Sequence, residues 1–369
     1  MRVLLITSDA YGSNGGIALY NRDLVQALCA LPDVEEVVIV ARIVQFAPSD
    51  IPTRVRFHCE ATRGKPAFVA AARAVGHEHF DLIICGHINL LPVAAMLRWR
   101  QKSPLVLLAY GVDVWKPTYW LNRRLVACVD AVWAISAITR DRMNAWSKLS
   151  DHRYYLLPNA IHLERYGLAP RRADLIERFG LVGRRVLLTL GRLSAADRYK
   201  GIDEVLEVMP TLLGRQPDLT YLIAGDGDDR PRLEAKARDL GVSSHVVFTG
   251  FVQENDKADI FRLADVFVMP GRGEGFGFVF LEAMACGVPV VASRLDGSLE
   301  AVLGGSLGRA VNPDDSENIV EAICEALMES PHIPDGLAYF AFPRFVDRVD
   351  AAVRTSIQLS SKLRKRRMG

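Results

Sequence analysis

The chain has few cysteines, and they show none of the spacings that bind metals or build a disulfide framework. Its six cysteines are scattered, and no two form a C-x-x-C pair. We therefore expect neither a zinc site nor disulfide bonds, and most of the thiols lie in apolar runs that indicate reduced core residues. A run of about 18 apolar residues, the length that spans a bilayer, is also absent.

The sequence also lacks an excess of charge of one sign. Its formal net charge of +2 over 369 residues does not match the basic surplus of nucleic-acid-binding proteins, so no nucleic-acid partner is expected. The length favours two domains of roughly 150–200 residues. The opening MRVLLITS indicates a buried strand and not a signal peptide, so we expect a cytoplasmic protein, with the inner face of the membrane as a further location.

Short apolar runs alternate with helical patterns, and this alternation starts twice. The strands expected first are VLLITS, VEEVVIVAR, DLIICGH, PLVLLAYG and AVWAIS; those expected later are RRVLLTLGRL, LTYLIAGDG, HVVFTGF, DVFVMPG and PVVASR. This βαβ rhythm predicts an α/β protein with two Rossmann-like, doubly wound parallel-sheet domains, over 1–165 and 166–335, and a helical segment over 336–369. Such sheets bind ligands at the carboxyl ends of their strands, so a cleft between facing domains is the expected site.

The segment GRGEGFGFVFLE (271–282) places glycines on a turn between a strand and a helix. Free N–H groups at a helix start, with about half a positive charge, suit a phosphate. Glu274 would repel that phosphate and is expected to accept hydrogen bonds from hydroxyl groups, as is Glu282 further along the helix. A ligand that carries hydroxyls, then phosphates and then further hydroxyls is a nucleotide sugar. The alternative, a surface glutamate in a turn plus one on a helix face, stays open, but the glycines between them, the strand before and the helix after favour the ligand site.

A second segment, GRLSAADRYKG (191–201), supplies positive charge after the strand VLLTL. A diphosphate needs about two positive charges, which Arg192 and Lys200 would provide, whereas Arg198 is more simply a solvated loop charge. With these two cations, and with no paired-aspartate motif, neither a metal nor another cofactor is expected. Gly15 and Gly16 form a third glycine loop before a helix, and AGDGDD (224–229) is interpreted as a structural turn.

The ordered set of motifs resembles the retaining GT-B glycosyltransferases of family 4, also called the glycosyltransferase 1 group. The matching pieces are the Gly15–Gly16 loop, LPNAIHLERY, GRLSAADRYKG, AGDGDD, VFTGFV, the run ADVFVMPGRGEGFGFVFLEAMACGVPVVAS and DGSLEAV. The likeness covers nearly the whole chain. It implies the GT-B fold, with the last helix crossing back onto the N-terminal domain, and transfer of a hexose from a UDP- or GDP-linked donor to an acceptor hydroxyl with retained configuration.

The resemblance also implies roles for single residues. The predicted catalytic residues are Glu274, which would contact the donor sugar, and Arg192 and Lys200, which would bind the diphosphate and stabilise the leaving group. The remaining predicted donor contacts are the ribose ligand Glu282, the base neighbour Val252, and the backbone groups of Gly16, Phe276 and Gly277. The last two backbone groups would meet the sugar and the phosphate.

One position departs from the family pattern. Tyr110 stands where a histidine is frequent, and because tyrosine does not titrate near neutral pH it favours a sugar contact over proton transfer. Tyr110, Asp113, His87 and Gly15 are candidate contacts to the sugar or the acceptor. Three alternatives stay open: a non-catalytic nucleotide-sugar-binding subunit, a sugar phosphorylase or free-sugar synthase, and a nicotinamide-dependent oxidoreductase. The absence of G-x-G-x-x-G argues against the last.

The acceptor is expected to be a saccharide or a lipid-linked saccharide used in surface polysaccharide or glycolipid assembly. KPTYWLNRR (116–124), the run through Trp146 and the tail SSKLRKRRMG combine basic and aromatic residues. These segments favour a peripheral membrane contact, with about 1 kcal/mol from each basic residue near an anionic surface. Buried aromatic residues and a solvated chain end would explain the same pattern, and both interpretations stay open.

Overall fold

The computed structural model describes the backbone of residues 1–368 and the side chains of residues 1–363. The chain divides into two compact units: unit 1 holds residues 1–160 and the C-terminal helix from Phe342, and unit 2 holds residues 161–341. The basic side chains of residues 364–367, which the sequence analysis singled out, lie outside the described residues. No helix in the described part of the chain is both long and apolar enough to cross a bilayer.

The unit boundaries differ from the predicted ones by a few residues at each end. The sequence analysis placed them at 165/166 and 335/336, whereas the structure places them at 160/161 and 341/342. Long-range contacts explain the difference. Ile161 forms a parallel bridge with Ala341, and the ring of Phe340 packs at 5.4 Å against that of Phe276, so both connecting segments belong to unit 2.

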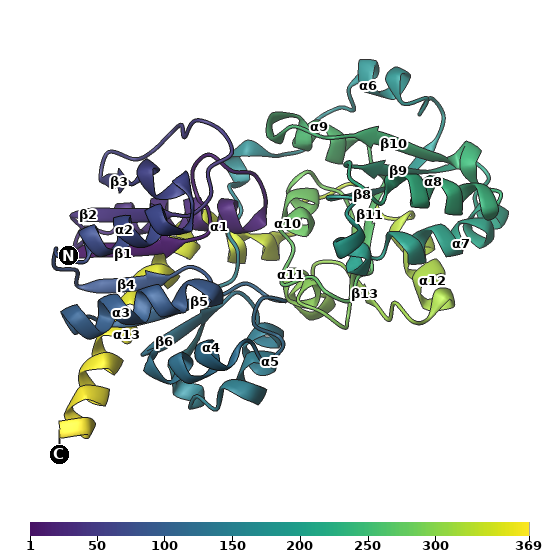
Figure 1. Cartoon of the computed structure of the whole chain (residues 1–369). Helices are drawn as coiled ribbons and strands as arrows, with labels where there is room; N and C mark the ends of the chain where they lie inside the picture. The colour runs from purple at the N-terminus through teal and green to yellow at the C-terminus, as the bar shows by residue number, and fades with distance from the viewer. Residues whose placement is uncertain (369) are drawn as a thin grey trace. The chain divides into compact units, whose positions relative to one another are not determined.

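Unit 1 contains a parallel sheet of seven strands in the order β3-β2-β1-β4-β5-β6-β7 (Figure 1). Its strands are β1 (Arg2–Thr7), β2 (Glu36–Ala41), β3 (Val55–Phe57), β4 (Leu82–Cys85), β5 (Leu105–Ala109), β6 (Ala131–Ala134) and β7 (Tyr154–Leu156). Its α-helices are α1 (Gly16–Ala30), α2 (Lys65–Val75), α3 (Leu91–Gln101), α4 (Trp120–Leu125), α5 (Ala137–Ser147) and α13 (Phe342–Met368).

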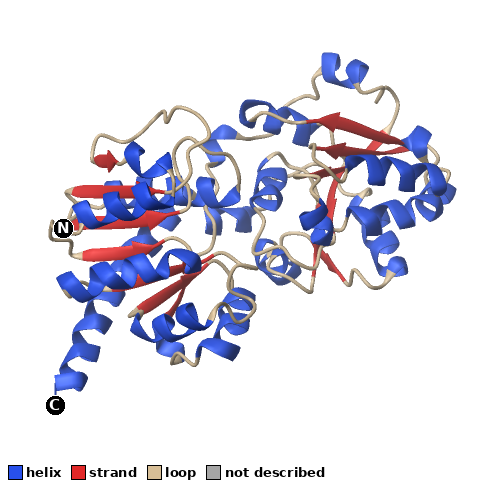
Figure 2. Cartoon of the chain, in the orientation of Figure 1, coloured by secondary structure: helices blue, strands red, loops and turns tan. Residues whose placement is uncertain are grey.

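Unit 2 repeats this plan with six parallel strands in the order β10-β9-β8-β11-β12-β13. Its strands are β8 (Arg185–Leu190), β9 (Leu219–Ala224), β10 (Val246–Gly250), β11 (Val266–Met269), β12 (Val290–Ser293) and β13 (Arg309–Val311). Its α-helices are α6 (Ala173–Arg178), α7 (Ile202–Arg215), α8 (Arg230–Asp239), α9 (Lys257–Arg262), α10 (Phe278–Ala285), α11 (Ser298–Ala301) and α12 (Ser316–Ala326). In each unit, helices flank the strands (Figure 2).

The strands that the sequence analysis expected are all present, and the three that it missed are short strands at sheet edges. β3, β7 and β13 have three residues each, and each stands at the end of its sheet. The central strands are buried on both faces and therefore read as continuous apolar runs. β3, β7 and β13 are short and only partly buried, so their sequences carry no such run.

The C-terminal helix α13 packs on unit 1. The ring of Phe345 meets the ring of Tyr20 on α1 at 5.8 Å in an edge-to-face arrangement, and Ser356 accepts a hydrogen bond of 3.1 Å from the indole of Trp133 on β6. The predicted return of the last helix to the N-terminal part of the chain thus agrees with these contacts. Amphipathic spacing supplies the apolar stripe that this packing buries.

Candidate active site

The strand order of unit 2 reverses direction between β8 and β11, which are neighbours in the sheet. From β8 the chain moves outward through β9 and β10, and it then returns to lay β11 on the other side of β8. The loops that leave the two strands diverge at such a point, and they leave room for a ligand at the carboxyl edge. These loops span 191–201, which is the predicted cation segment, and 270–277, which overlaps the predicted segment 271–282.

Lys200 and Glu274 are brought together by these two loops. The Lys200 ammonium donates a hydrogen bond of 3.2 Å to Oε2 of Glu274, and the two side chains are 18% and 20% exposed. Burial lowers the pKa of Lys200, but the charges of Glu274, Tyr199 and Asp197 and the hydrogen bond to Glu274 together outweigh it, so the pKa is raised and the ammonium stays charged. The pair therefore places one cation and one anion side by side at a position that water reaches only in part.

Arg192 lies on the same loop as Lys200 and points its guanidinium outward. Its Nε donates to the carboxylate of Asp197 at 2.7 Å, and this bond raises the pKa of Arg192. The side chain is 72% exposed, whereas Asp197 is buried. Asp197 therefore holds the stem of Arg192, and the terminal nitrogens stay available to a ligand.

Two of the four glycines in 271–277 have a packing role. A Cβ on Gly273 would lie 2.6 Å from the ring of Tyr199, and one on Gly271 would lie 2.7 Å from the carbonyl oxygen of Tyr199. Tyr199 directly precedes Lys200. These glycines thus let the 191–201 loop rest on the 270–277 loop, which sets the distance between Lys200 and Glu274.

Gly277 has a different role, because it caps the start of α10. Its φ of +92° is in the region that side-chain-bearing residues rarely adopt, and an added Cβ would lie 2.7 Å from the ring of Phe280. Phe276, just before it, is buried against Phe340, so only its backbone is left for a ligand. The predicted backbone contacts at both positions are compatible with this placement.

Asp296 anchors the turn that carries Glu274. Its Oδ2 accepts from the backbone N–H of Glu274 at 2.9 Å, and its Oδ1 accepts from the N–H and the hydroxyl of Ser298 at 3.0 and 2.6 Å. Burial raises the pKa of Asp296, and these hydrogen bonds oppose the effect. DGSLEAV (296–302) is among the motifs that carry the family resemblance, but no role for Asp296 was predicted from it.

Glu282 is buried in α10, and within the described chain only one of its two carboxylate oxygens accepts hydrogen bonds. Oε1 accepts from the hydroxyl of Tyr166 at 3.1 Å and from the ammonium of Lys257 at 3.2 Å. Oε2 is buried and has no hydrogen-bond partner among the described side chains. Burial raises the pKa of Glu282, and the positive charge of Lys257 works against this rise. A buried acceptor without a donor is costly, so this oxygen is suited to a hydroxyl of a bound ligand.

Val252 follows β10 and is half-buried. It lines a cavity of about 170 Å³ together with Thr249, Phe251, Asp256 and Ile260. Ile260 of this cavity belongs to α9, and Lys257, the first residue of α9, contacts Glu282. The helix α9 therefore contributes both to the cavity beside Val252 and to the surroundings of Glu282.

In unit 1, Gly15 and Gly16 form the exposed start of α1, after β1. Gly15 has a φ of +114° and no atom within 4 Å of an added Cβ, so the helix start is open. His87 follows β4, and its Nδ1 accepts from the N–H of Asn89 at 3.1 Å. Burial, with the charge of Arg42, lowers the pKa of His87, so its neutral form is favoured.

Tyr110 and Asp113 follow β5, the next strand along that sheet. The hydroxyl of Tyr110 donates to Oδ1 of Asn21 on α1 at 2.7 Å, and Asn21 in turn donates to Oγ1 of Thr7 at 2.8 Å. Tyr110 is therefore committed to a buried network in this structure. The carboxyl oxygens of Asp113 are buried, and burial raises its pKa to about 7 against the opposing effect of nearby backbone N–H groups of residues 110–114.

Arg198 belongs to the framework and not to the candidate site. Its guanidinium donates to Asp229 at 2.7 Å, and Asp229 also pairs with Arg232. The turn AGDGDD packs directly on the first loop: an added Cβ on Gly225 would lie 1.9 Å from the carbonyl oxygen of Gly191. The structural interpretation of that turn agrees with this contact.

Sequence reasoning missed Tyr199, Asp296, Tyr166 and Lys257, and it also missed Asn21. Tyr199 stands directly before the proposed cation Lys200, and Asp296 and Tyr166 each lie in a quoted motif, so these three could have been noted. Lys257 and Asn21 carry no local signal, because their partners are far away in the chain.

Two doubly wound units, with glycine and charge at the switch point of the second, define the GT-B class of fold. A family model described as Glycosyltransferase Family 4 matches residues 14–165, and one described as Glycosyl transferases group 1 matches residues 184–329. The chain is 30% identical to the alpha-D-kanosaminyltransferase of Streptomyces kanamyceticus over 298 residues, which cover 80% of this chain and 72% of that one. The chain belongs to this glycosyltransferase family.

Other relatives share shorter segments or the fold. The GDP-mannose-dependent alpha-(1-6)-phosphatidylinositol monomannoside mannosyltransferase of Mycolicibacterium smegmatis is 38% identical over 218 residues, which cover 56% of this chain and 55% of that one. The match thus spans about half of that relative. Anabaena HepE, solved with UDP and glucose, superposes with a TM-score of 0.70 at 21% identity and covers 99% of this chain and 100% of its own. At that identity the likeness shows the fold.

Proposed function

We propose that this protein is a retaining glycosyltransferase that moves a hexose from a UDP- or GDP-linked donor to an acceptor hydroxyl. The observation that carries the proposal is the Lys200–Glu274 pair of 3.2 Å beside the outward-pointing Arg192. A nucleoside diphosphate sugar brings the complement of that pair, because its phosphates are anionic and its sugar carries hydroxyls. The unpaired Oε2 of Glu282 would accept the ribose hydroxyls.

The two cations act on the leaving group. When the bond between the anomeric carbon and the phosphate oxygen breaks, negative charge grows on the diphosphate. Lys200 and Arg192 stabilise that charge as it develops, and the start of α10 adds the positive end of a helix dipole. Hydrogen bonds of charged groups contribute about 1.5–3 kcal/mol each, so two cations can neutralise a diphosphate without a metal ion.

Retention of configuration is proposed through attack on the same face of the sugar. The acceptor oxygen forms the new bond to the anomeric carbon as the bond to phosphate breaks. The proton of the acceptor hydroxyl passes to the departing phosphate oxygen, so no enzyme nucleophile is required. Glu274 holds the sugar hydroxyls and orients the anomeric carbon through this step.

The acceptor is proposed to be a saccharide or a lipid-linked saccharide of surface polysaccharide or glycolipid assembly. The named mycobacterial relative, which acts on a phosphatidylinositol mannoside, supports a glycolipid. The similarity to a kanosaminyltransferase supports sugar transfer, and its name specifies no acceptor.

The test combines donor binding with turnover. A set of UDP- and GDP-linked hexoses is screened for thermal stabilisation, and the donor that binds is used in a transfer assay. Lys200→Ala is expected to lower the rate at saturating donor by about two orders of magnitude, as loss of an electrostatic stabiliser does. Arg198→Ala, which removes a cation of the same loop that pairs with Asp229, is the control. Nearly full activity of Lys200→Ala would disprove the leaving-group role.

A further inference from the structure

Residues 112–124 of unit 1 carry an exposed surface that the proposed donor chemistry does not use. We define this 112–124 patch by its exposed side chains: Val112, Lys116, Tyr119, Trp120, Leu121 and Arg123. Tyr119 is 81% exposed and Trp120 is 67% exposed. Single exposed apolar residues are common, but four within one short segment mark an interaction surface.

Residues within and beside the patch are held by burial and by hydrogen bonds, so its exposure does not come from a frayed loop. Val114 is fully buried, and its carbonyl oxygen accepts a hydrogen bond of 2.7 Å from the indole of Trp146. The indole of Trp115 donates to Thr139 at 3.1 Å. On α4, Leu125 is buried while its neighbours on the other face are exposed. The interior of unit 1 thus holds the segment and turns the aromatic rings outward.

The patch also carries positive charge without a counter-charge. Lys116 and Arg123 form no ion pair with any carboxylate in the described chain, and Arg124 lies over the ring of Trp120 at 5.4 Å. The acid within the segment, Asp113, has its carboxyl oxygens buried. The exposed face of the patch is therefore cationic.

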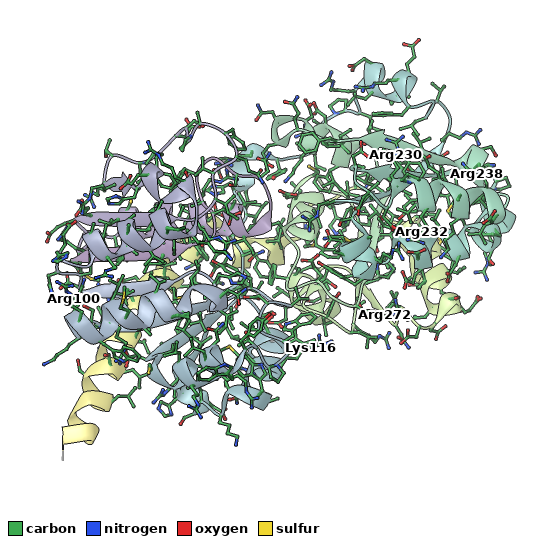
Figure 3. The ribbon with its side chains drawn as sticks, viewed as in Figure 1. Arg100, Lys116, Arg230, Arg232, Arg238 and Arg272 are labelled. Carbon is green, nitrogen blue, oxygen red and sulfur yellow. The ribbon has the colours of Figure 1, made fainter. Side chains whose placement is uncertain are left out.

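Three arginines of unit 2 differ from Lys116 and Arg123, because each of them pairs with a carboxylate. Arg230 pairs with Glu234, Arg232 with Asp203 and Asp229, and Arg272 with Asp314. Figure 3 labels these three arginines and also Lys116. These three arginines are therefore neutralised by carboxylates, whereas Lys116 and Arg123 of the patch are not, within the described residues.

We propose that the 112–124 patch docks the protein on the surface of an anionic phospholipid membrane. Tyr and Trp rings sit at the level of lipid headgroups, with the apolar body toward the acyl chains, and basic residues add attraction to anionic lipid. α4 has six residues, so it lies on the surface and does not enter as a span. A protein partner would need acidic groups facing Lys116 and Arg123, and it is an outcome of the test.

The experiment measures co-sedimentation of the full chain with vesicles of phosphatidylcholine plus phosphatidylglycerol and with vesicles of phosphatidylcholine alone. Binding is expected to the anionic vesicles and to fall as salt is raised, because salt screens exposed charge. Trp120→Ser is expected to lower the partition coefficient about tenfold, in line with burial of a large aromatic side chain. Lys116→Gln and Arg123→Gln are each expected to lower it about fivefold.

Two matched controls separate the patch from general surface properties. Trp99→Ser removes an exposed tryptophan from the last turn of α3, whose neighbour Arg100 lies far from Lys116 in Figure 3. Arg238→Gln removes an exposed cation from α8. Both are expected to keep binding within about twofold of the unchanged protein. Thermal melting of each variant checks that it folds, which is expected because the altered side chains are exposed.

A third variant replaces the four basic residues of 364–367 by serine. The proposal is overturned if this variant loses vesicle binding while Trp120→Ser keeps it, since the tail would then be the anchor. It is also overturned if the full chain binds neither kind of vesicle, which would leave the patch to a protein partner. The measurement needs no sugar donor, so its failure is distinguishable from failure of the proposed transfer reaction.

Discussion

The ring of Tyr199 lies against the backbone of Gly273, in the space that a side chain at position 273 would occupy. A Cβ there would lie 2.6 Å from two carbons of the ring. The contact joins the loop after β8 to the loop after β11, and Lys200 and Glu274 are the next residues along each loop. The glycine at 273 therefore sets the separation of the charged pair.

Gly273→Ala is expected to push the two loops apart. Overpacking of this kind costs about 1–3 kcal/mol of stability, and here it also moves Lys200 away from Glu274. We expect a lower melting temperature together with a loss of transfer rate. Gly214→Ala is the control, since an added Cβ on that helical glycine meets no atom within 4 Å. A fully active Gly273→Ala would show that the loop spacing is not critical.

Asp296→Ala is expected to release the turn that carries Glu274, because three hydrogen bonds are lost. Misplacement of a reacting group by about 1 Å can cost about 10²-fold in rate, so kcat should fall while nucleoside diphosphate binding changes little. Asp296→Asn should restore only part of the rate, since both carboxylate oxygens accept from N–H donors. Asp315→Ala, which removes the cap of α12, should lower stability alone. Equal loss of kcat and of nucleotide affinity in Asp296→Ala would contradict this positioning role.

Lys257→Met is expected to weaken donor binding at acid pH first. Burial raises the pKa of Glu282, and the charge of Lys257 opposes that rise, so its removal raises the pKa further. Only the ionised carboxylate accepts hydrogen bonds with both oxygens, so affinity falls as the pH drops through this pKa. The acid limb of the donor-affinity profile should move to higher pH, with about a tenfold loss of affinity. Lys236→Met, on α8 and paired with Asp203, should leave the profile in place.

Asp113 is expected to give the protein a pH-dependent stability. Its pKa is raised from 3.8 to about 7 by burial. Between these two values the unfolded chain releases the proton and the folded chain keeps it, so the free energy of unfolding falls as the pH rises through this window. Asp113→Asn should remove this fall. The difference in melting temperature between the two proteins, measured across the window, should grow toward pH 7; a constant difference would rule the assignment out.

Much of the fold follows from the local pattern. Central strands such as VLLIT and VLLTL are buried on both faces, so their sequences are apolar throughout, and their alternation with amphipathic helices indicates parallel sheets. The charges and glycines at the ends of β8 and β11 could be placed near one another from the same pattern, because carboxyl ends of parallel strands meet at one edge. The sequence by itself thus determined the class of fold and the position of Arg192, Lys200 and Glu274 at a sheet edge.

Only the tertiary structure decided which side chains meet there. Tyr166 lies 116 residues before Glu282, and Asp296 lies 22 residues after Glu274, yet each pair is joined by a hydrogen bond. The hydroxyl of Tyr110 likewise reaches Asn21, 89 residues earlier. Such pairings depend on the packing of whole elements and leave no periodicity in the chain. For the same reason β3, β7 and β13 and the residues that hold the 112–124 patch became visible only when the elements were assembled.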